Sequence, residues 1–267
     1  MIPIVGGIDR MTMEREKLHI WDIPVDKVDR AKAMAIFDEM MAEPGCSMIV
    51  TPNSEIVMNA SKDDELADLI REAELVIPDG IGLVYASKIL GQPLNERVTG
   101  IDFADAALQK LAKEGKSVFF FGSKPDGGSG VSVAQMAAEK KMAEYPGLVV
   151  SGMRDGYFKP EDEDSIVAQI NASGAELLLV ALGSPKQEKF IQRHRGEFQN
   201  VRAAIGIGGS LDVWAGTLKR APEFYQKHGL EWLYRLIQEP SRYKRMAALP
   251  LFMMKVVMTK GRKKNGN

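Results

Sequence analysis

The sequence contains few of the residues that build disulfides and metal centres. Cys46 is the only cysteine among 267 residues, so the chain has no disulfide framework and no thiolate metal site. Its three histidines, His19, His194 and His228, are scattered without the spacing of metal ligands. Such cysteine usage is typical of the reducing cytoplasm. We therefore predict a cytoplasmic protein with an inert thiol and a site without a metal.

Long apolar runs are also missing. No apolar signal-peptide segment occurs near the N-terminus, and residues 1–16 are predicted to be disordered. Residues 246–258 form an apolar stretch of 13 residues that contains Pro250 and Lys255, whereas about 20 residues are needed to span a bilayer. With its basic neighbours, this stretch predicts a helix lying in a membrane interface. The alternatives are a helix packed on the main domain and a contact between copies of the chain.

Charge is nearly balanced over the whole chain, at a net −1, but it is unevenly distributed. From Arg235 to Asn267 the chain carries nine lysines and arginines against one acid, a net +8, and the preceding 234 residues carry −9. A basic tail on an acidic body indicates an anionic partner such as nucleic acid, phospholipid or a diphosphate. A merely solvated tail is the plainer interpretation.

Short apolar runs alternate with helical patterns through most of the chain. The runs that predict strands are 18–23, 48–52, 75–77, 117–122, 148–152, 176–182 and 203–207. Strands that alternate with helices of this length form βαβ units and hence a mostly parallel sheet. The expected fold class is α/β, a Rossmann-like sheet with helices on both faces. We place this domain at residues 17–216 and a helical, basic and apolar appendage at residues 217–267.

The stretch from Leu75 to Gly82 combines a buried strand with a carboxylate at its end. Pro78 cannot continue a ladder of hydrogen bonds and therefore ends the strand. Asp79 follows at the carboxyl end of the strand, where open α/β sheets bind their ligands. The same position suits a helix N-cap, whose carboxylate only accepts backbone N–H groups. Both roles are open from this stretch alone.

Three glycine-rich loops follow other predicted strands, at residues 122–129, 183–187 and 206–212. Each loop alone is a weak signal, because tight turns after strands need glycine in any case. Together, at one edge of a parallel sheet, they favour an anionic or nucleotide ligand. The triplet Asp162-Glu-Asp164 matches the D-x-D pattern of metal-dependent sugar-nucleotide enzymes, but acids at a helix start are explained by the helix dipole.

Six motifs follow one another along the chain. They are Thr51-Pro-Asn53, Pro78-Asp-Gly-Ile-Gly82, Glu96-Arg-Val-Thr-Gly100 with Asp102, Phe120-Phe-Gly122, Gly183-Ser-Pro-Lys-Gln-Glu188, and Gly206-Ile-Gly-Gly-Ser210 with Asp212. In this order they resemble the WecG/TagA/CpsF family of bacterial glycosyltransferases, over roughly residues 17–255. Such a series is far more specific than any single glycine loop.

The resemblance implies an inverting glycosyltransferase that needs no metal or other cofactor. The most similar branch of the family moves N-acetylmannosamine (ManNAc) from UDP-ManNAc to undecaprenyl-diphosphate-GlcNAc in a β-1,4 linkage, for wall teichoic acid or a related cell-surface polysaccharide. The implied partners are the UDP-sugar donor, the polyprenyl-diphosphate acceptor and the inner leaflet of the cell membrane, which the appendage would contact. A homo-oligomer is possible, and no nucleic acid is implied.

Two alternatives to this activity remain. The first keeps the family and changes the donor to UDP-ManNAc uronic acid, UDP-glucose or UDP-galactose. The second is a nucleotide-binding regulatory module with a basic tail that binds lipid or nucleic acid.

The family's site residues fall on matching positions of this chain. Asp79 would be the catalytic base, Arg97 would neutralise the departing UDP, and Gln187 would offer a hydrogen-bond donor or acceptor. Because the other motif residues accompany it, the catalytic role of Asp79 is favoured over the role of a helix cap. Substrate contacts are expected from Thr51, Asn53, Gly122, Ser184, Gly206, Gly208, Ser210 and Asp212. Contacts to the lipid diphosphate are expected from Arg235, Arg242 and Arg245.

Overall fold

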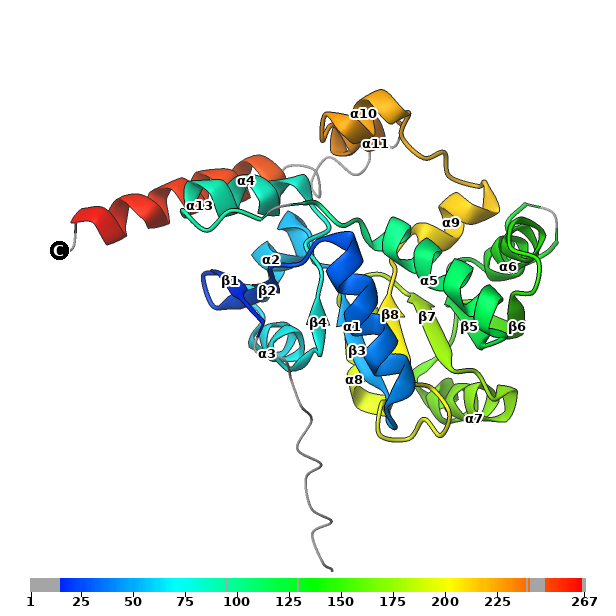
Figure 1. Ribbon diagram of the computed structural model, residues 1–267. Helices are drawn as coiled ribbons and strands as arrows, with labels where there is room; N and C mark the ends of the chain where they lie inside the picture. Colours follow the sequence, from blue (N-terminus) through cyan, green and yellow to red (C-terminus); the bar gives the residue numbers. More distant parts are fainter. Residues whose placement is uncertain (1–14, 95, 129, 239, 241–247, 266–267) are drawn as a thin grey trace, which may run out of the picture.

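A six-stranded parallel sheet forms the centre of the molecule in the computed structural model (Figure 1). The structure describes residues 15–94, 96–128, 130–238, 240 and 248–265. The strands are β3 (Ser47–Val50), β4 (Leu75–Val76), β5 (Ser117–Gly122), β6 (Val149–Arg154), β7 (Leu177–Ala181) and β8 (Ala203–Gly206). Their order across the sheet is β4-β3-β8-β7-β5-β6. The predicted α/β class with a parallel sheet is confirmed.

Helices cover both faces of this sheet because its strands are apolar on both sides. One face carries α1 (Arg30–Ala42), α5 (Gly100–Glu114), α6 (Val133–Glu144) and α9 (Ser210–Ala215). The other face carries α2 (Ser54–Ala60), α3 (Asp64–Glu72), α4 (Ile81–Ile89), η1 (Pro160–Asp162) with α7 (Glu163–Ser173), and α8 (Lys186–His194). Several helices begin at side chains that accept a backbone N–H, as good N-caps do. These caps are Asp29, Asn53, Asp63, Thr99 and Ser132.

The first predicted strand is corrected by the structure. Residues 18–23 do not join the parallel sheet but contribute to an antiparallel hairpin of β1 (Lys17–Ile20) and β2 (Ile23–Asp26). Trp21 lies in the turn with a positive φ of 56°. The chain therefore reverses direction within the apolar run 18–23, although the sequence pattern predicts one continuous strand. The buried carboxylate of Asp26 accepts the backbone N–H of Val76 at 2.8 Å and ties the hairpin to β4.

The helices that follow two neighbouring strands lie on opposite faces of the sheet. Strand β3 leads into α2 on one face, and β8 leads into α9 on the other. A crevice forms at the carboxyl ends of such a strand pair, and open α/β sheets bind their ligands there. The loops after β3 and β8 are therefore where a functional site is expected.

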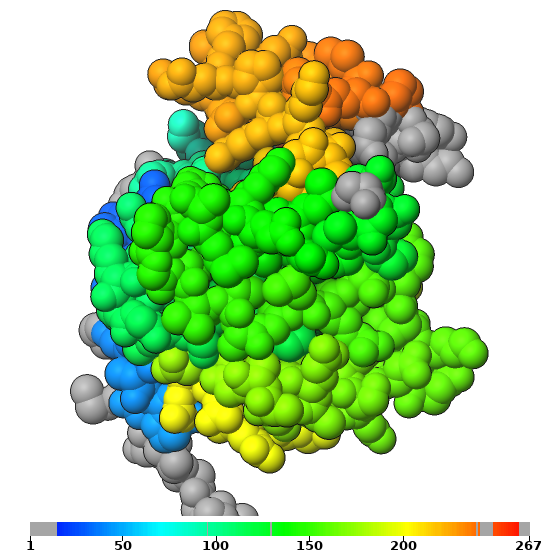
Figure 2. All heavy atoms as spheres, turned by 90° about the vertical axis from the view of Figure 1, so that its right-hand side faces the viewer, coloured from blue at the N-terminus to red at the C-terminus, as the bar shows by residue number. Residues whose placement is uncertain are grey.

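The C-terminal region consists of α10 (Glu223–Lys227), α11 (Glu231–Gln238) and α13 (Ala248–Asn265). In Figure 2, the orange segment with α10 and α11 stands as a raised cap on the body of the molecule. Helix α13 instead packs along α2 and α4 (Figure 1). Within the described ranges, no helix has the length and hydropathy needed to cross a bilayer.

Helix α13 is anchored to the domain by one of its faces. Phe252 and Val256 are buried in the core shared with α2 and β3. The ring of Phe252 meets the edge of Trp21 with 5.6 Å between ring centroids, and Trp21 Nε1 donates to Thr259 Oγ1 at 3.2 Å. Lys255 Nζ lies 4.1 Å from the centroid of the Trp21 ring, a cation–π contact. The alternative of a helix packed on the main domain is thus correct for this face.

Replacement of Phe252 by alanine tests this anchoring. A cavity in place of a fully buried phenylalanine costs about 3–5 kcal/mol, so F252A is expected to lower the free energy of unfolding in urea or to release α13 as a unit. Hydrogen exchange of the α13 amides distinguishes destabilisation of the whole domain from local release of α13. M254A is the matched control, since Met254 is 56% exposed on the other face of the helix. Equal effects of the two substitutions would contradict the proposed anchoring.

Candidate active site

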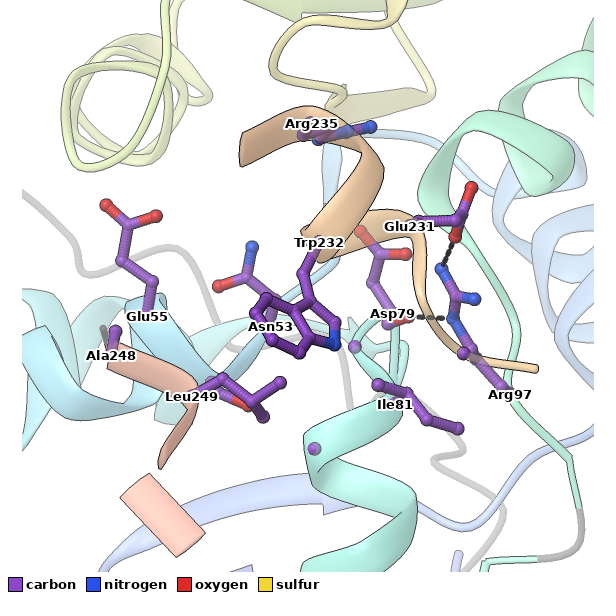
Figure 3. Close-up of a pocket in the computed structure, with 14 residues that line it drawn as sticks. Asn53, Glu55, Asp79, Ile81, Arg97, Glu231, Trp232, Arg235, Ala248 and Leu249 are labelled. Atoms are coloured by element: carbon purple, nitrogen blue, oxygen red, sulfur yellow. Dashed lines mark hydrogen bonds and ion pairs between the residues drawn. The ribbon is translucent and has the colours of Figure 1, made fainter. Parts of the chain in front are cut away.

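A pocket lies at the carboxyl edge of the sheet, between α2, α4 and α11 (Figure 3). Its cavity volume is about 130 Å³. The lining combines a polar floor with a roof made by the C-terminal region. The lining residues are Asn53, Ser54, Glu55, Asp79, Gly80, Ile81, Gly82, Arg97, Gly229, Glu231, Trp232, Arg235, Ala248 and Leu249. Four of the predicted site residues, Asn53, Asp79, Arg97 and Arg235, are thus brought together.

Asp79 is held in the floor of the pocket by its backbone. Its N–H donates to the carbonyl oxygen of Pro52 at 3.2 Å, which joins the loop after β4 to the loop after β3. The N-cap of α4 is Gly80, and α4 has no side-chain cap. The interpretation of Asp79 as a helix cap is therefore wrong. Its carboxylate instead points toward α11 (Figure 3).

The surroundings of Asp79 favour a protonatable carboxylate. Burial raises the pKa of Asp79 above its ordinary value, and the negative charge of Glu231 adds to this rise. The positive charges of Arg97 and Arg235 and a hydrogen bond from the Gly100 backbone oppose it, but burial dominates. A carboxylate with a raised pKa is a stronger base than an ordinary aspartate.

Arg97 joins the floor of the pocket to its roof. Its Nε donates to the backbone oxygen of Asp79 at 2.7 Å, and its terminal NH2 group forms an ion pair with Glu231 of α11. Both contacts are drawn as dashed lines in Figure 3. The guanidinium thus fixes the Asp79 loop and presents positive charge to the cavity.

Asn53 and Thr51 follow β3 but have different surroundings. Asn53 Oδ1 accepts the N–H of Ile56 at 3.0 Å as the N-cap of α2, and Asn53 lines the pocket. The buried hydroxyl of Thr51 donates to the carbonyl oxygen of Gly206 at 3.0 Å and so bridges β3 and β8. Thr51 also packs against Gly100, where an added Cβ would come within 2.9 Å of its hydroxyl oxygen. Thr51 therefore supports the pocket from below.

Gln187 lies beneath the glycine loop after β8 rather than in the pocket lining. Its Oε1 accepts the N–H of Gly208 at 3.1 Å, and its Nε2 donates to Glu188 at 2.9 Å. A Cβ on Gly206 would come within 2.5 Å of Gln187 Nε2, so a larger residue there would force Gln187 to move. The side chain of Gln187 is 3% exposed. Its place in the structure is that of a brace for the loop.

The remaining predicted contacts form a neighbouring cluster around the ends of β5, β7 and β8. Ser123, just after Gly122, donates its hydroxyl to Asp212 at 2.8 Å. Gly122 has a φ of 129° and passes so close to Ala181 that a Cβ would meet its carbonyl oxygen at 2.4 Å. Of the other two positions, Ser210 is buried and donates to the carbonyl oxygen of Ile207, and Ser184 lies beside Glu188.

The roof of the pocket contains residues that motif reasoning missed. Glu231 and Trp232 begin α11, and Trp232 points into the pocket between Asn53 and Asp79 (Figure 3). The spacing of Glu231 and Arg235 by four residues places them on one face of a helix, and this signal could have found Glu231. The predicted residues Arg242 and Arg245 lie outside the described part of the chain.

Metal ligands do not cluster in the described ranges. Among these residues, no group of three or more histidines, cysteines, aspartates and glutamates could hold a metal ion. Asp162 of the D-x-D triplet accepts the backbone N–H of Lys159 at 2.9 Å, and Asp164 lies in the first turn of α7. These acids occupy the helix-start positions predicted for them.

Comparison with known proteins assigns the chain to a family. The model of the glycosyl transferase WecG/TagA/CpsF family matches residues 18–266. The chain belongs to this family. It is 37% identical over 211 residues to an N-acetylglucosaminyldiphosphoundecaprenol N-acetyl-beta-D-mannosaminyltransferase of Bacillus spizizenii, covering 79% of each chain. It is also 37% identical over 218 residues to the enzyme of the same name from Bacillus subtilis, covering 82% of each chain.

Membership of the WecG/TagA/CpsF family decides between a glycosyltransferase and a regulatory module. The chain is a glycosyltransferase, so the regulatory-module alternative is set aside. A sugar transfer needs a base for the acceptor hydroxyl and positive charge for the leaving group. The pocket contains groups of both kinds, the carboxylate of Asp79 and the guanidinium groups of Arg97 and Arg235.

The raised pKa of Asp79 predicts how D79N changes stability with pH. A folded pKa above the unfolded one contributes stability below the unfolded value, and this contribution is lost as pH rises through the folded value. The amide introduced by D79N cannot ionise, so the variant does not lose this stability as pH rises. Thermal or urea unfolding is therefore expected to show D79N more stable than the wild type at neutral pH, by about 1.4 kcal/mol for each pKa unit.

Two comparisons check this assignment. The difference between D79N and the wild type should disappear below about pH 3, where Asp79 is protonated in both the folded and the unfolded chain. D68N is the control, because Asp68 is exposed and pairs with Arg71 on the surface of α3. A D79N protein that is less stable than the wild type at neutral pH and equal to it in acid would show a lowered pKa instead.

Proposed function

We propose that the enzyme transfers ManNAc from UDP-ManNAc to undecaprenyl-diphosphate-GlcNAc, with inversion and in a β-1,4 linkage. The observation that carries the proposal is the carboxylate of Asp79, with a raised pKa, in one pocket with Arg97 and Arg235. The names of the two Bacillus relatives supply the donor sugar and the lipid acceptor. The same geometry would serve UDP-ManNAc uronic acid, UDP-glucose or UDP-galactose, which remain alternative donors.

The chemistry follows from the charges in the pocket. Asp79 accepts the proton of the acceptor hydroxyl as its oxygen forms a bond to the anomeric carbon of the donor sugar. The bond from that carbon to the diphosphate breaks, and the electron pair leaves with UDP. Arg97 neutralises the charge that develops on the diphosphate, and Arg235, which the family resemblance assigns to the lipid diphosphate, adds positive charge in the same pocket. The backbone N–H groups at the start of α4, beside Gly80 and Gly82, add a positive dipole end.

This arrangement supports a transfer that needs no metal ion. Two guanidinium groups and a helix N-terminus provide the positive charge that a divalent cation provides in other sugar-nucleotide enzymes. The neighbouring cluster of Gly122, Gly206, Gly208 and Asp212 is the proposed place of the uridine. Here glycines let a nucleotide approach the backbone, and Asp212 can accept from a ribose hydroxyl.

We further propose that the enzyme docks on the cytoplasmic face of the membrane through α13. The face of α13 opposite its anchor exposes Leu251, Met254, Val257 and Met258. These residues are spaced by three and four positions and share one side of the helix. The C-terminal 33 residues carry a net +8, which complements anionic lipid headgroups. A lipid-linked acceptor would meet the enzyme at this surface.

A transfer assay with purified enzyme tests the activity. UDP-sugars are incubated with a GlcNAc-diphosphate-lipid analogue, and the disaccharide product is quantified. We expect turnover with UDP-ManNAc, with and without EDTA, and a loss of at least 10²-fold in D79N because the base is missing. UDP binding by D79N, measured by calorimetry, is expected to persist.

The assay has a matched control and clear contrary outcomes. D162N removes an acid outside the pocket, from the D-x-D triplet, and should leave turnover unchanged. Turnover by D79N at the wild-type rate would refute the base assignment. Sensitivity to EDTA would refute the metal-independent reaction, and turnover with a different UDP-sugar alone would replace the donor.

Vesicle binding tests the proposed docking surface. The double variant M254E/M258E is expected to bind vesicles that contain phosphatidylglycerol about tenfold or more weakly than the wild type, because two apolar side chains lose their contact with the bilayer. Co-sedimentation measures the bound fraction. V149E is the control, since Val149 is 45% exposed on β6, at the opposite edge of the sheet. Equal loss in both proteins would argue against α13 as the docking surface.

A further inference from the structure

The helix that roofs the pocket is weakly held to the body of the enzyme. None of the eight residues of α11, all of which the structure describes, is buried. Its tertiary contacts include the ring of Tyr234 against Tyr225 of α10, with centroids 5.2 Å apart. Gly229, just before α11, has a φ of 69° and packs on Ile81, where a Cβ would come within 2.5 Å. A glycine in this conformation suits a pivot.

The ion pair between Glu231 and Arg97 crosses from this roof to the floor. Its side chains are 14% and 20% exposed, so the pair is partly shielded from water. Arg97 is the residue assigned above to the leaving diphosphate. Glu231 therefore gives Arg97 a carboxylate partner in the position where an anionic substrate needs its charge.

The cavity beneath α11 is small. Its volume of about 130 Å³ is below the roughly 300–1,000 Å³ of sites that hold a small molecule. A sugar with its diphosphate needs more room than this. Motion of α11 about Gly229 would enlarge the cavity without disturbing the sheet, because α11 contributes no buried side chain.

We propose that Glu231 is a latch: its ion pair with Arg97 holds α11 over the pocket of the free enzyme, and a nucleoside diphosphate releases it by taking its place on Arg97. Glu231 is thus a positioning residue that acts through Arg97. The inference rests on the proposed function, because it takes the Asp79 pocket as the place where the diphosphate binds.

The latch also connects donor binding to the state of the base. The charged groups that line the pocket with Asp79 are Glu55 on α2, Arg97 after α4, and Glu231 and Arg235 on α11. Loss of the Glu231 charge removes a repulsion from Asp79 and leaves Arg97 free to attract it. Both changes lower the pKa of Asp79 in the free enzyme. In the complex, the diphosphate already replaces Glu231, so its loss changes little.

Binding of UDP and of uridine to the full chain tests the latch by calorimetry. E231Q is expected to bind UDP about two- to fivefold more tightly than the wild type, because the ligand no longer competes with an ion pair. Uridine has no phosphate, and its affinity should not change. E231A should show the same pattern as E231Q, and E223Q on α10 is the control that removes a carboxylate outside the pocket.

The pH profile gives a readout that a purely structural role would not move. The acidic limb of kcat/KM, which reports the free enzyme, is expected to shift toward lower pH in E231Q because the repulsion from Glu231 is lost. The limb of kcat, which reports the complex, should stay in place. Unchanged or weaker UDP binding in both E231Q and E231A, with wild-type affinity intact, would overturn the latch alone. A wild-type enzyme that binds no UDP would overturn the proposed function and the latch together.

Discussion

The close approach of backbone at the carboxyl ends of β3 and β8 is the constraint on which the site depends. Thr51 donates to the carbonyl oxygen of Gly206, and Gly100 and Gly206 leave no room for a Cβ. Gln187 braces the next turn through Gly208. Motifs that are far apart in the sequence therefore form one packed layer. The pocket with Asp79 rests on this layer, and a shift in any member would move this proposed base relative to its substrates.

Burial and charge act in opposite directions on that base. A carboxylate enclosed by protein prefers to be neutral, whereas neighbouring guanidinium groups favour its charged form. At Asp79 burial dominates, although Arg97 and Arg235 belong to the same pocket. The backbone contact of Arg97 Nε helps to explain how this balance is kept, since it directs part of the guanidinium to a carbonyl oxygen and away from the carboxylate. In the proposed reaction, Arg97 can thus neutralise the leaving group without forming a salt bridge to the carboxylate of Asp79.

The sequence predicts the sheet and the convergence of Asn53 and Asp79 for a simple reason, whereas Arg97 follows helix α4 and is indicated only by the family motif. In a parallel sheet the ends of all strands meet at one edge, so residues that follow strands become neighbours. What Gln187 touches could not be predicted, because a side chain at the start of a helix can face either the cavity or the loop beneath it. Glu231 was missed for a related reason. Its spacing to Arg235 indicates only a shared helix face. Its proposed role depends on Arg97, which lies 134 positions away in the chain, and no local pattern reports that contact.

The two ends of the C-terminal region differ in how firmly they are held, and this difference suits a reaction at a lipid surface. Helix α13 buries Phe252 and Val256 in the main core, so its exposed apolar face keeps a fixed position relative to the sheet. Helix α11 has no fully buried residue and is tied to the pocket floor through Glu231. Because the proposed membrane contact belongs to the rigid part, docking would set the height of the pocket above the bilayer. The loosely held helix would then be free to adjust to the diphosphate, so that membrane docking and substrate binding need not disturb each other.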